Sequence, residues 1–171
     1  MSLCVRPRAV LGTVLAAALA ACATTFSGAN LVPGKSTATE VEATMGQPAA
    51  RIKLPGGDTL WQYPRGSAAR QTFAVRIGAD GIVREVSQIR TIENVGKIQI
   101  GRSTADDVRT LLGPPDRITS MRNIQRDVWE YSMFQDTRAV IVYLQLDASG
   151  RVREVLQVDD PAFINLGGPS M

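Results

Sequence analysis

The sequence contains no histidine among its 171 residues, and its two cysteines both lie within the first 22 positions. Without histidine there is no imidazole general base, no histidine-based catalytic triad and no histidine metal ligand. Without cysteine in the rest of the chain, a disulfide framework and a thiolate metal site are excluded there as well. We therefore expect no catalytic residues, no metal, no cofactor and no small-molecule substrate, and a function other than that of an enzyme.

Adjacent carboxylates are the nearest approach to a catalytic pair. Asp106-Asp107 and Asp159-Asp160 are the only two such pairs in the sequence. Neither is accompanied by a nucleophile with a neighbouring base. We interpret the first pair as charge that favours the dipole at a helix N-terminus, and the second as solvated charge at a strand end.

Positive charge is too scarce to indicate nucleic-acid binding. The formal net charge is +3, but Arg6 and Arg8 lie in a segment interpreted below as a removed leader. Without them, 17 of the 19 basic residues remain against 16 acidic ones, a net charge of +1. Domains that bind nucleic acid present a clustered basic face, so we expect no nucleic-acid partner.

Long hydrophobic runs are absent too. The longest small or apolar stretch, Ala9 to Ala21, has 13 residues, whereas a membrane-spanning helix needs about 20. The stretch follows two arginines and ends in small residues, which is typical of a secretory signal peptide.

The end of this stretch carries a more specific motif. Leu19-Ala20-Ala21-Cys22 resembles a bacterial lipobox, which implies cleavage after residue 21 and lipidation of Cys22 with acyl chains such as palmitate. Residues 22–33 then form a lipidated tether of about 18 Å r.m.s. length. Ala23 in place of aspartate implies sorting to the outer membrane. An ordinary secreted protein, or a buried Cys22, is the alternative.

The rest of the chain contains an internal match. Residues 34–48 and 101–115 are identical at seven of 15 positions, and residues 79–89 and 148–158 at seven of 11. Trp61 and Tyr63 match Trp129 and Tyr131 between these blocks. Three matching blocks in one order indicate a duplicated unit.

Each copy predicts one short helix. Thr37 and Thr104 are good N-caps, and Glu40 and Asp107 follow three residues later, as in a capping box. Gly46 and Gly113 are expected to form left-handed C-terminal caps before the prolines at 48 and 115.

Three strands are predicted after each helix, at 60–63, 72–77 and 83–89 in the first copy and at 128–131, 139–146 and 152–158 in the second. The apolar residues Val83, Val86 and Ile89 are three apart, which predicts a bulge near Glu85 and near Glu154. The fold class is therefore α+β, with two tandem helix–strand–strand–strand repeats and antiparallel sheets, at residues 34–92 and 93–160. We expect the copies to share an interface, through a joined sheet, with a short helical turn in 91–98 and a flexible tail at 161–171.

Three further patterns have a structural and a functional interpretation. The Trp–Tyr pairs are interpreted as core residues of one strand face, with a ligand-stacking surface as the alternative. Val140-Ile-Val-Tyr-Leu144 is apolar on both faces, which predicts a central strand covered on both sides, by the helix and the other copy or by a partner. The repeated Val-Arg-Glu-Val, at 83–86 and 152–155, is interpreted as surface charge, with a contact patch as the alternative.

The repeated pattern Gly-x-Ser-Thr-x-x-acidic-Val, a glycine and proline after the helix, and Trp-x-Tyr resemble the SmpA/OmlA (BamE-like) family of small outer-membrane lipoproteins. The resemblance covers about 60 residues in each copy, and it adds to the lipobox. It implies a periplasm-facing lipoprotein that acts as a non-catalytic scaffold in β-barrel protein assembly. The tandem arrangement also resembles the β-lactamase inhibitory proteins, which implies the alternative of a binding or inhibitory module for a periplasmic enzyme or envelope component.

Overall fold

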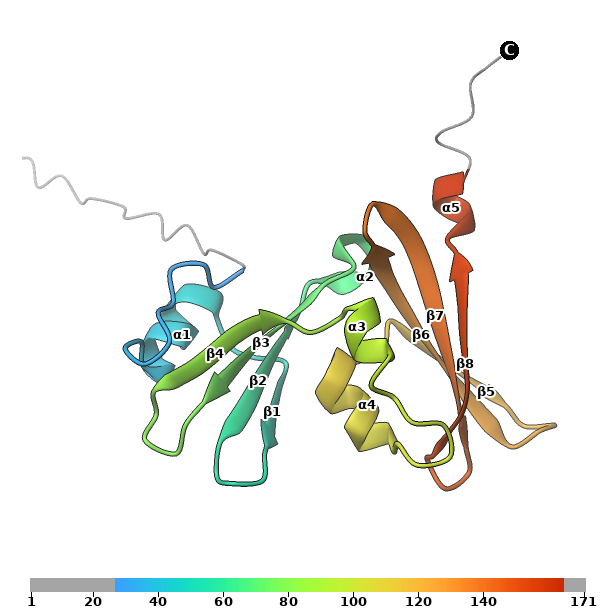
Figure 1. The fold of residues 1–171 in the computed structure, drawn as a ribbon, viewed down its shortest axis with the longest axis horizontal. Coiled ribbons are helices and arrows are strands. Elements are labelled where there is room, and N and C mark those ends of the chain that lie inside the picture. Colours follow the sequence, from blue (N-terminus) through green and yellow to red (C-terminus); the bar gives the residue numbers. More distant parts are fainter. Residues whose placement is uncertain (1–26, 165–171) are drawn as a thin grey trace, which may run out of the picture.

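The chain forms an α+β fold with two separate four-stranded antiparallel sheets (Figure 1). The structure is a computed structural model and describes residues 27–164. The signal peptide predicted at 1–21 and the lipidation site Cys22 lie outside the described residues. No helix within 27–164 is long and apolar enough to cross a membrane.

We call residues 27–90 the first unit and residues 91–164 the second unit. The first contains α1 (Ala38–Met45), β1 (Ala50–Lys53), β2 (Thr59–Pro64), α2 (Gly66–Ala69), β3 (Thr72–Ile77) and β4 (Val83–Gln88). The second contains α3 (Ile92–Val95), α4 (Ala105–Leu112), β5 (Arg117–Met121), β6 (Arg126–Gln135), β7 (Arg138–Asp147), β8 (Val152–Asp159) and α5 (Pro161–Ile164).

Each sheet has one strand more than the sequence predicted. The three predicted strands of each unit correspond to β2, β3, β4 and to β6, β7, β8. The additional strands β1 and β5 are edge strands of four and five residues without a buried side chain. β5 lacks the apolar alternation that identifies a strand, and β1 alternates over only four residues, so the three-strand prediction missed both.

The predicted capping boxes are confirmed. The amide N–H of Glu40 donates to Thr37 Oγ1 at 3.3 Å, and the amide of Thr37 donates to Glu40 Oε2 at 2.7 Å. Thr104 and Asp107 form the same pair of bonds, and the Thr104 amide holds the pKa of Asp107 below its usual value. These bonds satisfy donors that the first turn leaves free.

The prediction for the C-terminal glycines is correct only in part. Gly46 and Gly113 both have φ at +82°, but their ψ values of −165° and −168° are extended. They are therefore not in the left-handed helical region, and their conformation is one that glycine alone adopts readily.

The predicted bulges are present. Arg76 pairs with Glu85 while the next residue, Ile77, pairs with Val83, so Arg84 is the additional residue in β4. Arg153 is the additional residue at the matched place in β8. The bulge explains why apolar residues three apart share one face.

Each sheet packs one face against a helix of its own unit. In the first unit, Val41 and Met45 of α1 pack with Trp61, Tyr63 and Val75. In the second unit, Val108 and Leu112 of α4 pack with residues of the sheet, namely Trp129, Tyr131, Val142 and Leu144. The interpretation of the Trp–Tyr pairs as core residues is confirmed.

The ordered body begins before the boundary predicted at residue 34. Leu31 is buried in the first core, and the Gly34 amide donates to the Val83 carbonyl at 2.8 Å. The predicted tether of 22–33 is therefore too long at its C-terminal end. At the other end of the chain, Pro161–Ile164 form α5 rather than a flexible tail; residues 165–171 lie outside the described residues.

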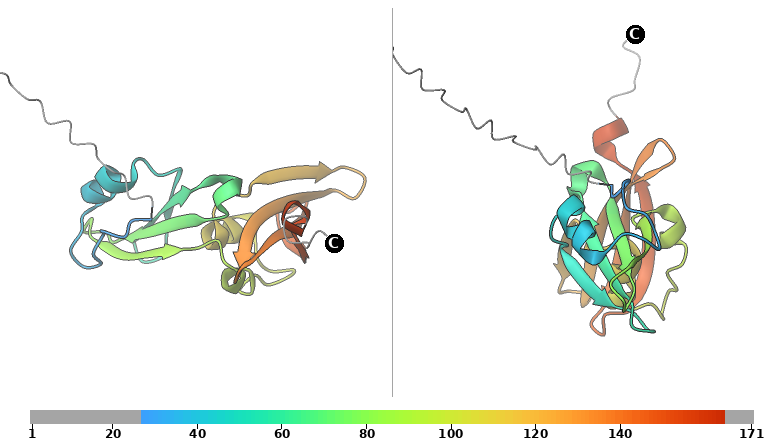
Figure 2. Two further views of the ribbon diagram at one scale, coloured as in Figure 1. Left: turned by 90° about the horizontal axis from the view of Figure 1, so that it is seen from above. Right: turned by 90° about the vertical axis from the view of Figure 1, so that its left-hand side faces the viewer.

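The two units meet through a sheet face and helix ends, so the expected joined sheet was wrong. Gln62 Nε2 of β2 donates to the Arg109 carbonyl of α4 at 2.7 Å. Arg90 is buried: its Nη1 lies 2.6 Å from Asp116 Oδ1, and its Nη2 donates to the Pro114 carbonyl. The order along the long axis is α1, first sheet, α3 with α4, second sheet (Figures 1 and 2).

Candidate protein-docking face

The second sheet leaves one of its faces uncovered by the described chain. Strand pairing places Glu130 opposite Tyr143 and Tyr143 opposite Leu156, while Ile141 lies opposite Val158. These positions alternate with the core residues Trp129, Tyr131, Val142 and Leu144, so they point away from α4. We call this side the open face; the apolar side chains at its centre are those of Val128, Ile141, Tyr143, Leu156 and Val158.

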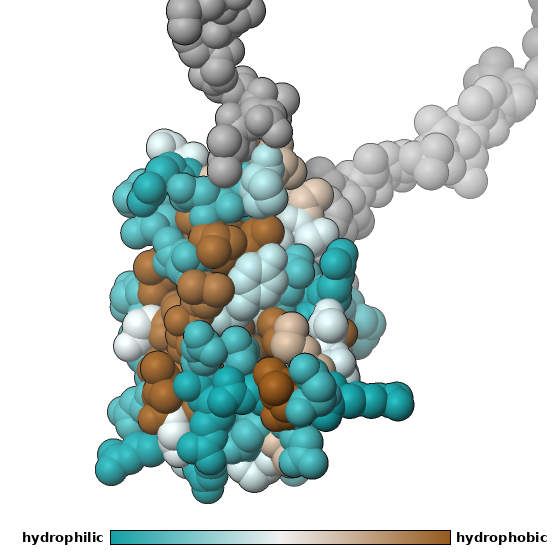
Figure 3. Space-filling model, turned by 90° about the vertical axis from the view of Figure 1, so that its right-hand side faces the viewer, coloured by the Kyte–Doolittle hydropathy of each residue, from teal (hydrophilic) through white to brown (hydrophobic). Residues whose placement is uncertain are grey.

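The open face is apolar and exposed to solvent. Leu156 is 48% exposed and Val158 36% exposed, and Val128, Ile141 and Tyr143 are half-buried. Figure 3 shows apolar residues gathered in a stripe on the side of the molecule that this sheet turns outward. Monomeric proteins rarely expose contiguous apolar patches larger than a few hundred Å², and such patches commonly mark interaction sites.

The sequence predicted that Val140–Leu144 is covered on both sides, by the helix and the other copy or by a partner, and the first of these alternatives was wrong. Val140, Val142 and Leu144 are fully buried beneath α4 and its neighbours, whereas Ile141 and Tyr143 reach the open face. The first unit packs against α3 and α4 on the opposite side of the second sheet. The other unit therefore does not cover this face, and cover by a partner stays a prediction.

The matched face of the first sheet is different. Gln62, Thr72 and Ala74 are buried there, at 1%, 0% and 1% exposure, because the end of α4 and the residues after it cover them. Toward its other end, this face becomes exposed at Arg76, which pairs with Asp58. The buried side chains of this covered face are therefore small or polar.

At three sequence-matched positions the open face is larger and more apolar, whereas its Val128 and Val158 match the equally apolar Leu60 and Ile89. Thr72, Ala74 and Ser87 correspond by strand register to Ile141, Tyr143 and Leu156. A face that had only to meet water would be expected to carry the more polar set. The more apolar set on the more exposed face indicates a surface that packs against protein.

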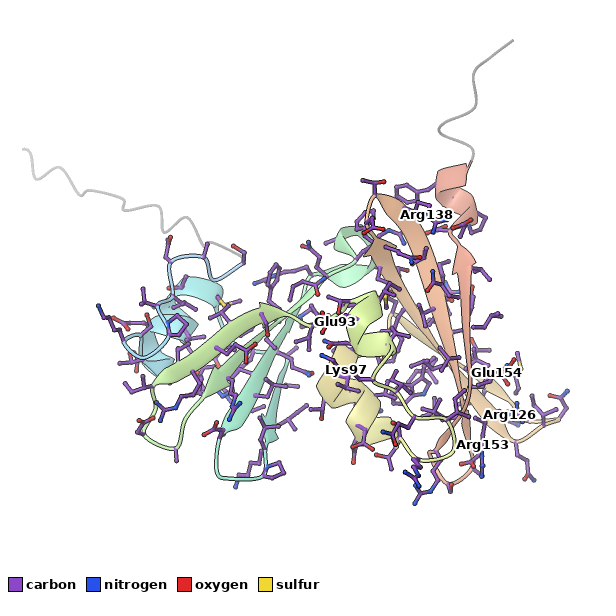
Figure 4. All side chains as sticks on the ribbon, viewed as in Figure 1. Glu93, Lys97, Arg126, Arg138, Arg153 and Glu154 are labelled. Atoms are coloured by element: carbon purple, nitrogen blue, oxygen red, sulfur yellow. The ribbon has the colours of Figure 1, made fainter. Side chains whose placement is uncertain are left out.

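Charge on the open face is balanced. Register places Arg117, Arg126, Glu130, Glu154 and Asp147 on it, and Asp147 forms an ion pair with Arg153 of β8. Arg126 lies 3.7 Å from Glu154 and donates to Gln145 Oε1 at 2.8 Å. Figure 4 shows Arg126 and Glu154 together toward one end of the sheet, and Arg138 at the other. The face therefore attracts neither a strongly acidic nor a strongly basic partner.

One end of the second sheet is held by an arginine of the first unit. Arg70 follows α2, forms a buried ion pair with Asp160, and donates to the Val140 carbonyl at 3.4 Å. Its guanidinium lies 5.6 Å and 4.6 Å from the ring centroids of Phe134 and Phe163. The Arg70 hydrogen bond lowers the pKa of Asp160. The interpretation of Asp160 as solvated charge was wrong, because Arg70 comes from a part of the chain 90 residues away.

A shallow recess of about 320 Å³ lies beside this end, lined by Thr137, Arg138, Ala139, Asp159, Asp160 and Phe163. Its charged groups already have partners, since Arg138 lies 3.9 Å from Asp159 and Asp160 binds Arg70. Within residues 27–164, no group of three or more candidate ligands is placed to hold a metal ion.

The remaining predicted positions lie away from the open face or at its edge. Asp106 and Asp107 occupy the first turn of α4, as predicted. Arg84 and Arg153 form exposed ion pairs with Asp80 and Asp147. The Asp106-Asp107 pair and the repeated Val-Arg-Glu-Val segments thus carry the surface charge that the sequence predicted.

Comparison with known proteins gives little further information. No family model and no curated protein matches the sequence. Among solved structures, the chain is similar to YjgB of Bacillus subtilis subsp. subtilis str. 168, a DUF4309 family protein. The match has a TM-score of 0.30 and 16% identity and covers 77% of this chain and 84% of that one. A likeness at this level carries no conclusion for either fold or function.

Proposed function

We propose that this protein is a non-catalytic docking scaffold of the bacterial cell envelope, built from two tandem copies of one unit and tethered by lipidated Cys22. The observation that carries the docking role is the open face, which is uncovered and, at three matched positions, more apolar than the covered face. The lipobox and the SmpA/OmlA-like pattern support a place at the outer membrane, accessory to β-barrel protein assembly.

The position of the open face suits a tethered protein. The described chain begins beside α1, where Leu31 packs with Val41 and Met45. The open face lies at the opposite end of the long axis (Figure 1). A tether that leaves from the α1 end therefore allows the second sheet to reach a partner without the first unit in between.

The buried contacts between the units support a rigid scaffold. Arg70 and Arg90 each connect the first unit to a carboxylate of the second, and both side chains are almost fully buried. Breaking such a pair leaves an uncompensated buried charge, so relative movement of the units is opposed.

The experiment is a pull-down of the C-terminally tagged chain from gently solubilised envelope, with mass spectrometry of what is recovered. Cys22→Ala tests the tether, and Leu156→Lys tests the open face. Arg84→Glu, at an exposed position on the first sheet, is the matched control. We expect to recover an envelope protein with the parent chain and with Arg84→Glu, but not with Cys22→Ala or Leu156→Lys. Equal recovery with the parent chain and with Leu156→Lys would refute the docking role.

The second candidate is a binding or inhibitory module for a periplasmic enzyme, which the two sheets in series favour. In that case a soluble enzyme is recovered equally well from Cys22→Ala. Titration of that enzyme with the chain then changes its activity at a stoichiometric ratio.

A further inference from the structure

We infer that the occupant of the open face is a second copy of this chain, packed face to face in a twofold-symmetric dimer. This rests on the proposed docking role of the face and names its partner. The inference depends on three properties of the face, which are its size, its balance of charge and the way it departs from the covered face.

The face is large enough for a dimer. β6 and β7 are each 10 residues long, or about 33 Å, and strands about 4.8 Å apart give a four-stranded face about 19 Å wide. Because β5 has five residues and β8 has eight, one face measures about 500 Å² and a pair about 1,000 Å², the smallest area expected of a biological interface. Tyr143, in the middle of the central strand β7, is the type of aromatic anchor found at the centre of such interfaces.

The charges of the face are compatible with its own copy. A twofold axis brings a patch against itself, so a patch of one sign would repel. Here Arg117 and Arg126 are balanced by Glu130 and Glu154, and the cross-strand pair Arg126–Glu154 can exchange partners across the axis. The same two carboxylates oppose contact with an anionic lipid surface.

The contact between the units argues against a helix end in this place. On the covered face, Gln62 Nε2 donates to a carbonyl at the end of α4. The matched residue of the open face is Glu130, whose carboxylate can only accept, so it would repel the negative end of a helix. Ala74, which leaves room for that helix, is replaced by Tyr143. The open face therefore favours a flat apolar surface such as an identical sheet.

The test is the molar mass of the full chain, by sedimentation equilibrium in a density-matched mild detergent. We expect a dimer for the parent chain, and monomers for Tyr143→Lys and Leu156→Lys with unchanged circular dichroism. Thr39→Lys, on the exposed side of α1, should remain dimeric. A monomeric parent overturns the inference, and so does a dimer that survives both changes on the open face.

Crosslinking in the membrane gives a second measurement that does not depend on detergent. Packed sheets lie about 10 Å apart, so a short bis-maleimide should join two chains that carry Tyr143→Cys, but not two that carry Thr39→Cys. Crosslinking of Thr39→Cys alone would overturn the inference.

The outcome is separable from that of the proposed function. A monomeric chain whose envelope partner depends on Leu156 overturns the second copy as occupant and leaves the docking scaffold standing. A dimer that depends on the open face, but recovers no envelope protein, supports the inference and refutes the scaffold.

Discussion

The two units of the molecule use the outer faces of their sheets in opposite ways. In the first unit, the face carrying Gln62, Thr72 and Ala74 is covered by the end of α4, and its side chains are small or polar. In the second unit, the matched face carries Ile141, Tyr143 and Leu156 and is exposed to solvent. The other face of each sheet is alike, with a Trp-x-Tyr strand beneath a capped helix of eight residues. The two sheets therefore share the same core arrangement, while their outer faces are adapted to different neighbours.

The largest effect on stability is expected when a lysine is placed at the centre of each outer face. Ala74→Lys places a charge on the covered face, where the cost of a buried unpaired ion is several kcal/mol, on the order of 3 or more. Tyr143→Lys, at the matched position, should change the free energy of unfolding by about 1 kcal/mol or less, because its side chain reaches solvent. Urea denaturation at low protein concentration measures both. Equal losses would show that the open face is covered after all.

The next effect concerns the buried charge that connects the units. Arg90→Ala leaves the Asp116 carboxylate without its ion-pair partner, which should lower the free energy of unfolding by about 3–5 kcal/mol. The exposed pair Arg84–Asp80 provides the control, since Arg84→Ala should cost about 0–1 kcal/mol. Urea denaturation again gives both numbers. A loss at Arg90 no greater than at Arg84 would show that the units do not need this pair.

A third change separates the two helix ends. Gly46→Ala and Gly113→Ala introduce the same backbone strain, because both glycines have φ at +82°. Only at Gly113 does an added Cβ meet the other unit, 2.7 Å from Thr72 Cγ2, whereas Gly46 has nothing within 4 Å. Gly113→Ala should therefore cost about 1–3 kcal/mol more than Gly46→Ala, as overpacking does. Thr72→Ser should recover part of the difference in a double-mutant cycle; full additivity would contradict the contact.

The smallest effect on stability is expected when the hydroxyl group of either buried tyrosine is removed. Tyr131 OH donates to the Gly113 carbonyl at 3.1 Å, whereas Tyr63 OH is buried without a hydrogen-bond partner. Tyr131→Phe should cost about 0.5–1.5 kcal/mol, and Tyr63→Phe close to nothing. Thermal denaturation of the two variants checks the order, and a larger loss at Tyr63 would reverse the assignment.

The same pair predicts alkaline behaviour. Burial raises the pKa of Tyr63 from 10.0 to about 12, and burial also raises the pKa of Tyr131. A raised folded-state pKa contributes stability that is complete below the unfolded value and is lost as pH rises through the folded value. Stability should therefore fall between about pH 10 and pH 12, and less so in Tyr63→Phe. Ultraviolet absorbance of tyrosinate follows the ionisation of the tyrosines as the parent chain and Tyr63→Phe are titrated.

Much of the local structure could be predicted from the sequence, because short-range interactions decide it. Thr37 with Glu40, and Thr104 with Asp107, form bonds within a single turn, and the bulges at Arg84 and Arg153 follow from apolar residues spaced three apart. Trp61 and Tyr63 are two residues apart on one strand face and were correctly placed in the core. The candidate site was seen in part, since Val140–Leu144 was recognised as apolar on both faces.

The rest depended on residues far apart in the chain. The sequence by itself determined the helix caps, the principal strands and the face of each sheet that becomes core, since these follow from hydrogen bonds and periodicity within about ten residues. The tertiary structure alone decided that Arg70 meets Asp160, 90 residues away, and that Gln62 meets Arg109, 47 residues away. It also decided which outer face the second unit covers. The core pattern that the two sheets share carries no signal for their packing order, so the tertiary contacts decided that the face around Tyr143 stays open.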